Sequence, residues 1–193
     1  MRIMSMLHAT HIDLDRMLAN VSCTCREMLH DRGCATVDTC DDPDELMRRM
    51  EGMERVIHGS GGRSIEVFFM LEERVSVKNI RIIMEASTAD TTIFVSTDGP
   101  TSFARKEAHT QWGYGIQFFR FVDLCMNITK HVLVPPHSLH VGERKHKDAH
   151  YPRMLVSDPI CQYYNFRVGD LIRIQRKHGC VQSFDYFRLV VSV

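Results

Sequence analysis

The last quarter of the chain, residues 151–193, is the part of the sequence that most restricts the fold. Asp158 stands before Pro159, and an acidic N-cap followed by proline at the first helical position is typical of a helix N-terminus. Gly169-Asp170 then predicts a turn before the alternating strand Leu171–Ile174. The apolar positions of the predicted short helix are Ile160, Tyr163, Tyr164 and Phe166.

A second strand is predicted from Phe184 to Val193, after a loop at Lys177-His178-Gly179-Cys180. A helix and one hairpin provide a single apolar face and too little core to be stable alone. We therefore expect this unit to dock on something larger.

This C-terminal run resembles one protein family, the fifth common subunit of the eukaryotic nuclear RNA polymerases, which has a counterpart in the archaeal polymerase. The segment Asn127–His137 resembles the family's entry into its C-terminal domain. The matching positions within the domain are Pro152-Arg153, Asp158-Pro159, Tyr164, Gly169, Ile172, Ile174, Arg176 and Tyr186-Phe187-Arg188-Leu189-Val190.

The N-terminal half resembles the same family more weakly. Met28–Gly33 is similar to the end of that domain's first long helix, and Phe68-Phe69, Glu72-Glu73 and Val77-Lys78 are similar to its central hairpin. The resemblance extends from about His30 onward, is patchy before Asp123 and is specific after Asn127.

The resemblance implies an α/β N-terminal jaw domain over residues 1–126, with restriction-endonuclease-like topology but no catalysis. It also implies a small α+β C-terminal assembly domain over residues 127–193. The implied function is that of a non-catalytic nuclear subunit, which anchors on the largest polymerase subunit and forms the lower jaw near downstream DNA. No cofactor, metal, membrane or homo-oligomer is implied. The residues expected at the subunit interface are Pro152, Asp158, Pro159, Tyr163, Tyr164, Phe166, Gly169 and Arg176.

The sequence departs from the family pattern after Arg176, where Lys177-His178-Gly179-Cys180 replaces the usual proline and serine, and at Lys130, where the family tends to have an acid. The residues before Asp13 also match poorly. Such departures suggest a divergent eukaryotic lineage, a specialised paralogue or a large DNA virus. A nucleolar paralogue confined to polymerase I and rRNA transcription is the hypothesis placed ahead of a viral origin.

The balance of charged residues restricts how the chain can bind nucleic acid. Lys+Arg and Asp+Glu both number 24, so no net charge attracts the whole protein to DNA, and any contact must be local and supported by a partner. Seven cysteines without a signal peptide indicate a reduced intracellular protein with free thiols. No apolar stretch approaches the roughly 20 residues that cross a bilayer.

Periodicity predicts strands interleaved with helices in the first half, and hence an α/β fold. Asp42 with Pro43 is interpreted as a helix cap, with a divalent-metal site as the alternative, and Gly59–Gly62 as a flexible loop. Asn127–Pro136 is the predicted boundary. The predicted elements are a helix over Asp13–Leu29 that stops at Gly33, strands over Ser64–Leu71 and Val75–Met84 joined by Glu72-Glu73-Arg74, a strand over Thr91–Ser96, a helix over Thr101–Ala108 and a strand over Gln117–Cys125.

One DNA-proximal site is predicted where Gly99-Pro100-Thr101-Ser102 opens a helix. Free amides and hydroxyls there can face a phosphate, and Arg105 with Lys106 adds charge one turn later. The equally weighted alternative is an ordinary Ser/Thr helix cap with solvated basic residues.

Other chemistry finds little support. Cys23-Thr24-Cys25 has the wrong spacing for zinc, and a solvated loop is favoured over a metal site for His137, His140, His146 and His150. The single Glu-x-Lys, Glu143-Arg144-Lys145, lies in the linker and not on a strand, where a metal-dependent nuclease needs it. Cys161 is expected to be a buried, inert thiol. The competing function classes are a free-standing nucleic-acid-binding or nuclease-like protein and a transcription adaptor.

Overall fold

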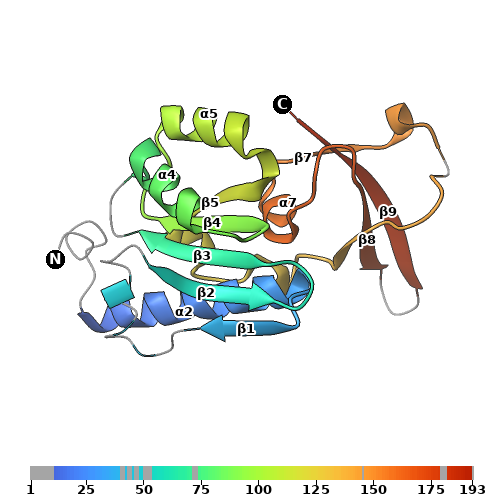
Figure 1. Ribbon diagram of the computed structural model, residues 1–193. Coiled ribbons are helices and arrows are strands. Elements are labelled where there is room, and N and C mark those ends of the chain that lie inside the picture. Colours follow the sequence, from blue (N-terminus) through green and yellow to red (C-terminus); the bar gives the residue numbers. More distant parts are fainter. Residues whose placement is uncertain are drawn as a thin grey trace. The chain divides into compact units, whose positions relative to one another are not determined.

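The computed structural model divides the chain into two compact units, Met1–Met126 and Asn127–Val193 (Figure 1). The structure describes residues 11–39, 42, 45, 48–49, 54–70, 74–144, 146–178 and 182–192. The helix start predicted at Pro43, the turn at Glu72-Glu73 and the loop residues Gly179-Cys180 lie outside these ranges. Within them, no helix is both long and apolar enough to span a bilayer.

The N-terminal unit contains a five-stranded mixed sheet in the order β1-β2-β3-β4-β5. The first three strands pair antiparallel, whereas β3, β4 and β5 pair parallel. The strands are β1 (Thr36–Thr39), β2 (Arg55–Ser60), β3 (Ile65–Met70), β4 (Thr91–Ser96) and β5 (Ile116–Arg120). This arrangement confirms the α/β class predicted for the first half.

Helices cover both faces of this sheet. Figure 1 shows α2 on one side and α4 with α5 on the other. Every residue of β3 and β4 is therefore buried, as expected for parallel strands covered on both faces. The helices whose bounds lie in the described ranges of the unit include α2 (His11–Asp31), α4 (Val77–Ala86), α5 (Ser102–Gln111), η1 (Gly113–Gly115) and α6 (Phe121–Leu124).

An aromatic row forms the core beneath α4 and α5. The strand register places Phe68, Phe94 and Phe118 side by side, with ring centroids 6.0 Å apart for the first pair and 5.6 Å for the second. Phe94 is fully buried at the centre of the row. The buried residues packed around it are Met70, Val75, Ile80, Ile83, Ala104, Ala108 and Ile116.

The opposite face of the sheet is covered by α2, and the helix predicted over Asp13–Leu29 is confirmed. Its buried stripe consists of Leu18, Val21, Cys25, Met28 and Leu29, all of them at predicted positions. Gly33 follows the helix with φ of +92°, a left-handed conformation that suits glycine and stops the helix.

The strand predicted over Val75–Met84 is wrong, because this segment forms α4. Ser76 caps it, its hydroxyl accepting from the Asn79 amide, and Ile80 and Ile83 are buried at helical spacing. β-Branched residues favoured a strand, but packing against the sheet decided for a helix. The central hairpin expected from Phe68-Phe69 and Val77-Lys78 is therefore also wrong.

Two further boundaries differ from the predictions. The strand expected to reach Cys125 ends at Arg120, and the apolar residues beyond it form the short helix α6. Gly59 and Ser60 belong to β2 and not to a flexible loop. A Cβ added at Gly59 would lie 2.7 Å from the Cys34 sulfur and 2.8 Å from Leu29 Cδ2, so this glycine permits close packing of β2 against the end of α2 and the residues after it.

The C-terminal unit is a small α+β structure with a four-stranded sheet in the order β6-β8-β9-β7. The predicted hairpin is confirmed as β8 and β9, although Lys177 and His178 lie in β8 and not in the loop. The elements are η2 (Ile128–Lys130), β6 (His137–Leu139), η3 (Asp148–His150), β7 (Arg153–Leu155), α7 (Pro159–Tyr164), β8 (Leu171–His178) and β9 (Gln182–Val191).

The helix α7 begins where the sequence predicts, because Asp158 Oδ1 accepts from the Ile160 amide at 2.9 Å. It ends at Asn165, which has a left-handed φ of 55°, so Phe166 lies beyond the helix and not within it. The core of the unit contains Met154, Ile160, Cys161, Phe166, Ile172, Ile174 and Val190.

Candidate functional site

The loop that leads into α5 is fixed by hydrogen bonds to an isolated bridge residue, Val75. The Val75 amide donates to the Gly99 carbonyl at 3.1 Å, and the Thr101 amide donates to the Val75 carbonyl at 3.2 Å. The Gly99 amide donates to the Ser96 hydroxyl at 3.0 Å, and the φ of Gly99 is +77°. These bonds fix the position of the first turn of α5.

Thr101 is the N-cap of α5, and its hydroxyl accepts from the Ala104 amide at 3.2 Å. The cap that the sequence offered as the alternative to a DNA site is therefore present. It occupies one of the amides that the DNA hypothesis assigned to phosphate.

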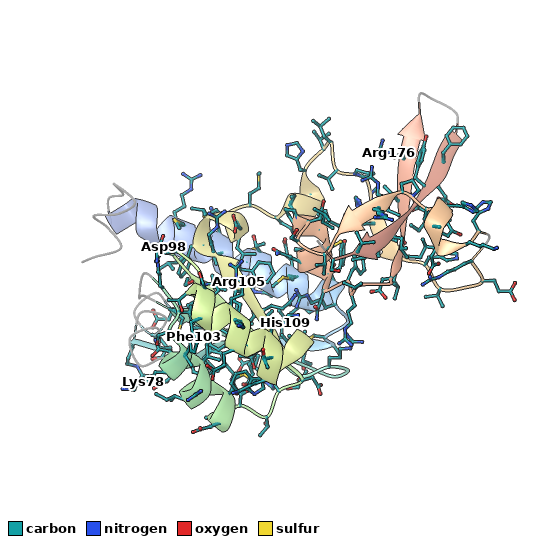
Figure 2. All side chains as sticks on the ribbon, turned by 90° about the horizontal axis from the view of Figure 1, so that it is seen from above. Lys78, Asp98, Phe103, Arg105, His109 and Arg176 are labelled. Atoms are coloured by element: carbon teal, nitrogen blue, oxygen red, sulfur yellow. The ribbon has the colours of Figure 1, made fainter. Side chains whose placement is uncertain are left out.

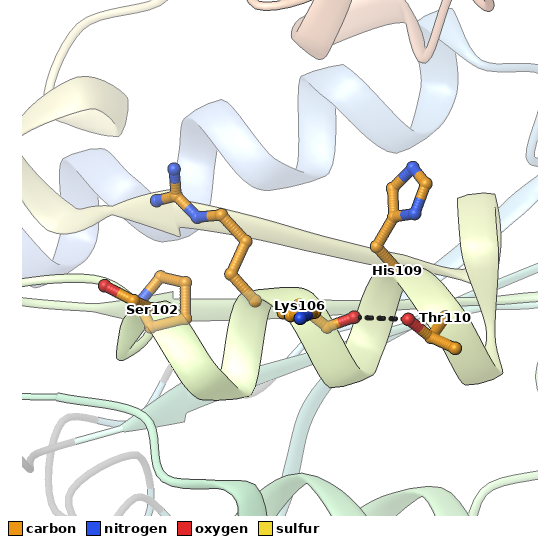
Figure 3. Close-up of a pocket in the computed structure, with 6 residues that line it drawn as sticks. Ser102, Lys106, His109 and Thr110 are labelled. Atoms are coloured by element: carbon orange, nitrogen blue, oxygen red, sulfur yellow. Dashed lines mark hydrogen bonds between the residues drawn. The ribbon is translucent and has the colours of Figure 1, made fainter.

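An open hollow of about 660 Å³ lies along the outer side of α5. Figure 3 shows His109 rising from one side of the helix and Thr110 hydrogen bonded to the Lys106 carbonyl. Of the five predicted DNA-proximal residues, four line this hollow and Thr101 caps the helix. The lining residues are Pro100, Ser102, Arg105, Lys106, His109 and Thr110.

The sequence-based prediction omitted His109 and Thr110. Both are detectable from spacing, because residue 109 follows Arg105 by four positions and residue 110 follows Lys106 by four, which places each pair on one side of a helix.

The basic residues of the hollow differ in their ion pairing from arginines elsewhere in the unit. Arg105, Lys106 and His109 form no ion pair with any residue in the described ranges. By contrast, Arg81 pairs with Glu107. Asp98, an exposed acid on the preceding loop, contributes to raising the pKa of Arg120, after the larger effect of Asp123. The described lining of the hollow thus consists of two cations, a histidine, two hydroxyl-bearing residues and one proline.

The second candidate surface lies on the β8–β9 hairpin and consists of Arg176, Phe184 and Tyr186; we call it the hairpin face. These residues are on the same side of the hairpin as the buried Ile172 and Ile174, since Arg176 pairs with Phe184 and Ile174 with Tyr186. Phe184 is 48% exposed and Tyr186 52% exposed. The Arg176 guanidinium lies over the Tyr186 ring, 5.4 Å from its centroid. Figure 2 labels Arg176.

The hairpin extends beyond its neighbouring strands. In the described structure, β6 pairs with β8 only over Ile172–Ile174, and β7 pairs with β9 only over Leu189–Val191. A two-stranded ribbon is marginally stable alone in water. The aromatic end of the hairpin is therefore a surface that a partner would stabilise.

The aromatic residues predicted at the interface lie mostly inside. Tyr163 is 2% exposed and Phe166 8% exposed, whereas Tyr164 is half-buried and stacks on Phe166 at 5.2 Å. The Tyr163 hydroxyl accepts from Asn127 at 3.1 Å. Tyr163 and Phe166 can thus support an interface from below, but they expose too little area to dominate it.

The remaining predicted interface residues have distinct positions. Pro152 and Pro159 are exposed, Asp158 caps α7, and Arg176 belongs to the hairpin face. Gly169 has φ of +94° in the turn before β8. The sequence-based prediction missed Phe184 and Tyr186, although their alternation with Asp185 places them on one face of a strand.

His137 on β6 interacts electrostatically with Asp158, Arg176 and Arg188. Its Nδ1 is 2.6 Å from the Pro135 carbonyl, and it is half-buried. Burial lowers its pKa below the ordinary value of 6.5, and Arg176 and Arg188 act in the same direction, whereas the Pro135 carbonyl and Asp158 oppose it.

This lowered pKa predicts a pH-dependent stability. As pH falls below about 6.5, the unfolded chain takes up a proton at His137 before the folded chain does, so the C-terminal unit should lose stability. His137→Gln should flatten the slope of urea midpoint against pH between about pH 7.5 and about pH 5. A slope equal to that of the wild type would contradict this role of His137.

Metal-ligating side chains do not cluster in the described ranges. No group of three His, Cys, Asp or Glu side chains there can hold a metal. His140 packs on Phe187 at 5.1 Å and His146 on Tyr151 at 5.9 Å. Cys161 is buried, as predicted, and burial raises the pKa of its thiol to about 12, which disfavours the reactive thiolate.

The buried acid of the N-terminal sheet is also engaged. Glu66 on β3 accepts from Arg55 at 2.9 Å and from the Ser87 hydroxyl at 2.6 Å. Both carboxylate oxygens are therefore hydrogen bonded within the fold, which favours a structural role.

Comparison with known proteins identifies a family and several relatives for this chain. Residues 126–190 match the family model for RNA polymerase Rpb5, C-terminal domain. The chain is 28% identical to the subunit RPABC1 of DNA-directed RNA polymerases I, II and III from Caenorhabditis elegans, over 87% of this chain and 92% of that protein. It is 30% identical to the subunit of that name from Dictyostelium discoideum, over 66% of this chain and 72% of the relative.

A further relative is subunit 5B of DNA-directed RNA polymerases IV and V from Arabidopsis thaliana, 24% identical over 86% of each chain. The class defined by fold and sequence is therefore that of small polymerase subunits with an Rpb5-type C-terminal domain. The chain belongs to the Rpb5 family, which includes RPABC1, and is a divergent member of it.

Proposed function

We propose that the chain is a non-catalytic structural subunit of a DNA-directed RNA polymerase and acts in transcription in the nucleus. The observation that carries the proposal is the match of residues 126–190 to the Rpb5 C-terminal domain, together with relatives named as polymerase subunits. Its partners are the other subunits of the polymerase.

The C-terminal unit is the proposed anchor on the largest subunit. Its hairpin face offers two half-exposed aromatic rings and an arginine, residue types that dominate interface energetics. Tyr164 and Pro159 add accessible apolar surface, while Tyr163 and Phe166 pack beneath. Asp158 and Gly169 set the geometry of α7 and of the turn before β8.

Alanine at both Phe184 and Tyr186 should weaken recovery of the largest subunit. Hot-spot aromatics contribute roughly 2 kcal/mol each, so the double variant should lose more than about a hundredfold in affinity. Quantitative pull-down of tagged chain measures this, with Val168→Ala as the control, since Val168 is 45% exposed in a turn outside the hairpin face. Equal recovery of the largest subunit by the wild type and the double variant would show that the hairpin face is not the anchor.

Asp158→Ala should have a smaller effect on the same recovery. Loss of the bond from Asp158 to the Ile160 amide removes a cap that contributes about 1 kcal/mol to α7. Asp158→Asn, which keeps a capping oxygen, is the matched control. Incorporation of the alanine variant at the wild-type level would count against this role of Asp158.

The N-terminal unit is the proposed lower jaw, with restriction-endonuclease-like topology and without catalysis. Its contact with downstream duplex DNA would be weak and independent of sequence, through Arg105, Lys106 and the hydroxyl-bearing start of α5. Arg105 and Lys106, which form no ion pair with the residues that the structure describes, support a contact of α5 with DNA phosphates.

The proposal extends to a paralogue confined to polymerase I in the nucleolus, suggested by the departures after Arg176. Co-purification of the polymerase I largest subunit alone would support the polymerase I paralogue. Recovery of the largest subunits of several polymerases would exclude it.

The competing classes predict other behaviour. A free-standing nucleic-acid-binding or nuclease-like protein would cut or tightly bind DNA as an isolated monomer in chromatography with a nuclease assay. A transcription adaptor would recover transcription factors without the polymerase core.

A further inference from the structure

The side chain of Phe103 is mostly exposed and lies outside the buried core cluster described for the N-terminal unit. It is the second residue of α5, directly after the Thr101 cap and Ser102, and 70% of it is exposed. The buried positions of α5 are Ala104 and Ala108, so the sheet holds the helix without help from Phe103.

The surroundings of Phe103 on α5 are polar and charged. Lys106 and Glu107 follow it by three and four residues and share its side of the helix, and Glu107 pairs with Arg81 of α4. Ser102, Arg105, Lys106 and His109 lie on the same helix and line the hollow along α5, where the described lining residues include no acid. A surface for a protein partner normally combines aromatic residues with further apolar residues. A mostly exposed aromatic ring next to a row of basic and hydroxyl side chains, with the nearby Glu107 already paired to Arg81, instead suits a ligand with a flat apolar face and an anionic backbone, which is the chemistry of nucleic acid.

The backbone beneath the ring is fixed. The hydrogen bonds of Val75 to Gly99 and Thr101, and the Thr101 cap, fix the first turn of α5. Figure 2 shows Phe103 and Arg105 extending from different sides of α5. A ring held in this way can contact a base step while cations along the helix contact phosphates of the same duplex.

We propose that Phe103 is a stacking residue, which packs its ring on the bases of downstream duplex DNA at a partly unstacked step while Arg105, Lys106 and His109 hold the adjacent phosphates. The inference rests on the proposed function, since it assumes that the N-terminal unit faces DNA within the polymerase. It goes beyond that function by adding an apolar contact to bases.

The test uses polymerase purified through the tagged chain and bound to a DNA scaffold with 2-aminopurine at successive positions of the downstream duplex. The fluorescence of 2-aminopurine rises when the base is unstacked from its neighbours. Wild-type complexes should show a rise at one position, Phe103→Ala complexes should lose it, and Phe103→Trp complexes should keep it. Ile82→Ala is the matched control, because Ile82 is an apolar residue 47% exposed on the neighbouring α4.

The outcomes separate this inference from the proposed function. If no polymerase co-purifies with the wild-type chain, the proposed function fails, and the inference fails with it. If polymerase co-purifies and the fluorescence is the same for wild type and Phe103→Ala at every position, the inference alone is overturned. It is also overturned if Phe103→Ala reduces the recovery of polymerase subunits, because Phe103 would then contact protein.

Discussion

Replacement of Ile172 by alanine is expected to unfold the C-terminal unit and to remove the chain from its polymerase. Ile172 is fully buried in the core formed by α7 and the hairpin. Truncation of a buried isoleucine to alanine costs roughly 2–5 kcal/mol, whereas a domain of this size is stable by roughly 3–10 kcal/mol. The substitution therefore removes a large part of the stability of the unit.

Two probes can follow the two units separately. Trp112 is the single tryptophan of the chain and lies in the N-terminal unit, so its fluorescence reports on that unit. Hydrogen exchange of peptides from β8 and α7 reports on the C-terminal unit. Ile172→Ala should accelerate exchange in those peptides and leave the urea midpoint of Trp112 fluorescence unchanged. Ile172→Val, a smaller truncation, should give an intermediate result. If Ile172→Ala also lowers the urea midpoint of Trp112 fluorescence, and by the free energy that the faster exchange of the C-terminal peptides indicates, the two units unfold together.

Phe94→Ala should have the converse effect. Phe94 is fully buried between Phe68 and Phe118, and truncation of a buried phenylalanine costs roughly 3–5 kcal/mol because it leaves a cavity and removes two aromatic contacts. The Trp112 midpoint should fall sharply, since Trp112 packs against the same core.

Polymerase recovery adds a second readout for Phe94→Ala. The variant should still recover the largest subunit, because the proposed anchor lies in the other unit. Ile82→Ala, at a half-exposed position of α4, should change the free energy of unfolding followed by Trp112 fluorescence by less than about 0.5 kcal/mol. Loss of polymerase by Phe94→Ala at a temperature where the C-terminal unit remains folded would contradict the division of roles.

Sequence alone predicted best those elements whose signals are local. Asp158-Pro159 marked the start of α7, Gly33 the end of α2, and the alternation after Gly169 marked β8. Each signal depends on backbone chemistry within a few residues, so tertiary context does not alter it.

The errors arose where tertiary packing decides the structure. The residues of α4 include Val77, Ile80 and Ile83, whose β-branched side chains favour a strand, but the parallel pairing of β3 with β4 requires a crossover, and α4 provides it. β1 and β2 were missed because their pairing, and the contact of Gly59 with Cys34, involve residues distant in sequence.

In the candidate site, too, local features were predictable and features set by tertiary packing were not. The start of α5 and its two adjacent cations were predicted from a cap and a charge pattern. The exposure of Phe103, Phe184 and Tyr186 could not be predicted, because it depends on which neighbours cover each ring. For the same reason Tyr163 and Phe166 were expected at a surface, although the fold buries them.

The most direct test of the central claim is affinity purification of the tagged full-length chain from its native cells, with the co-purifying proteins identified by mass spectrometry. We expect a stoichiometric largest subunit of a nuclear RNA polymerase with the wild-type chain and with Phe94→Ala, and its loss with Ile172→Ala. Recovery of the wild-type chain without any polymerase subunit would contradict the account.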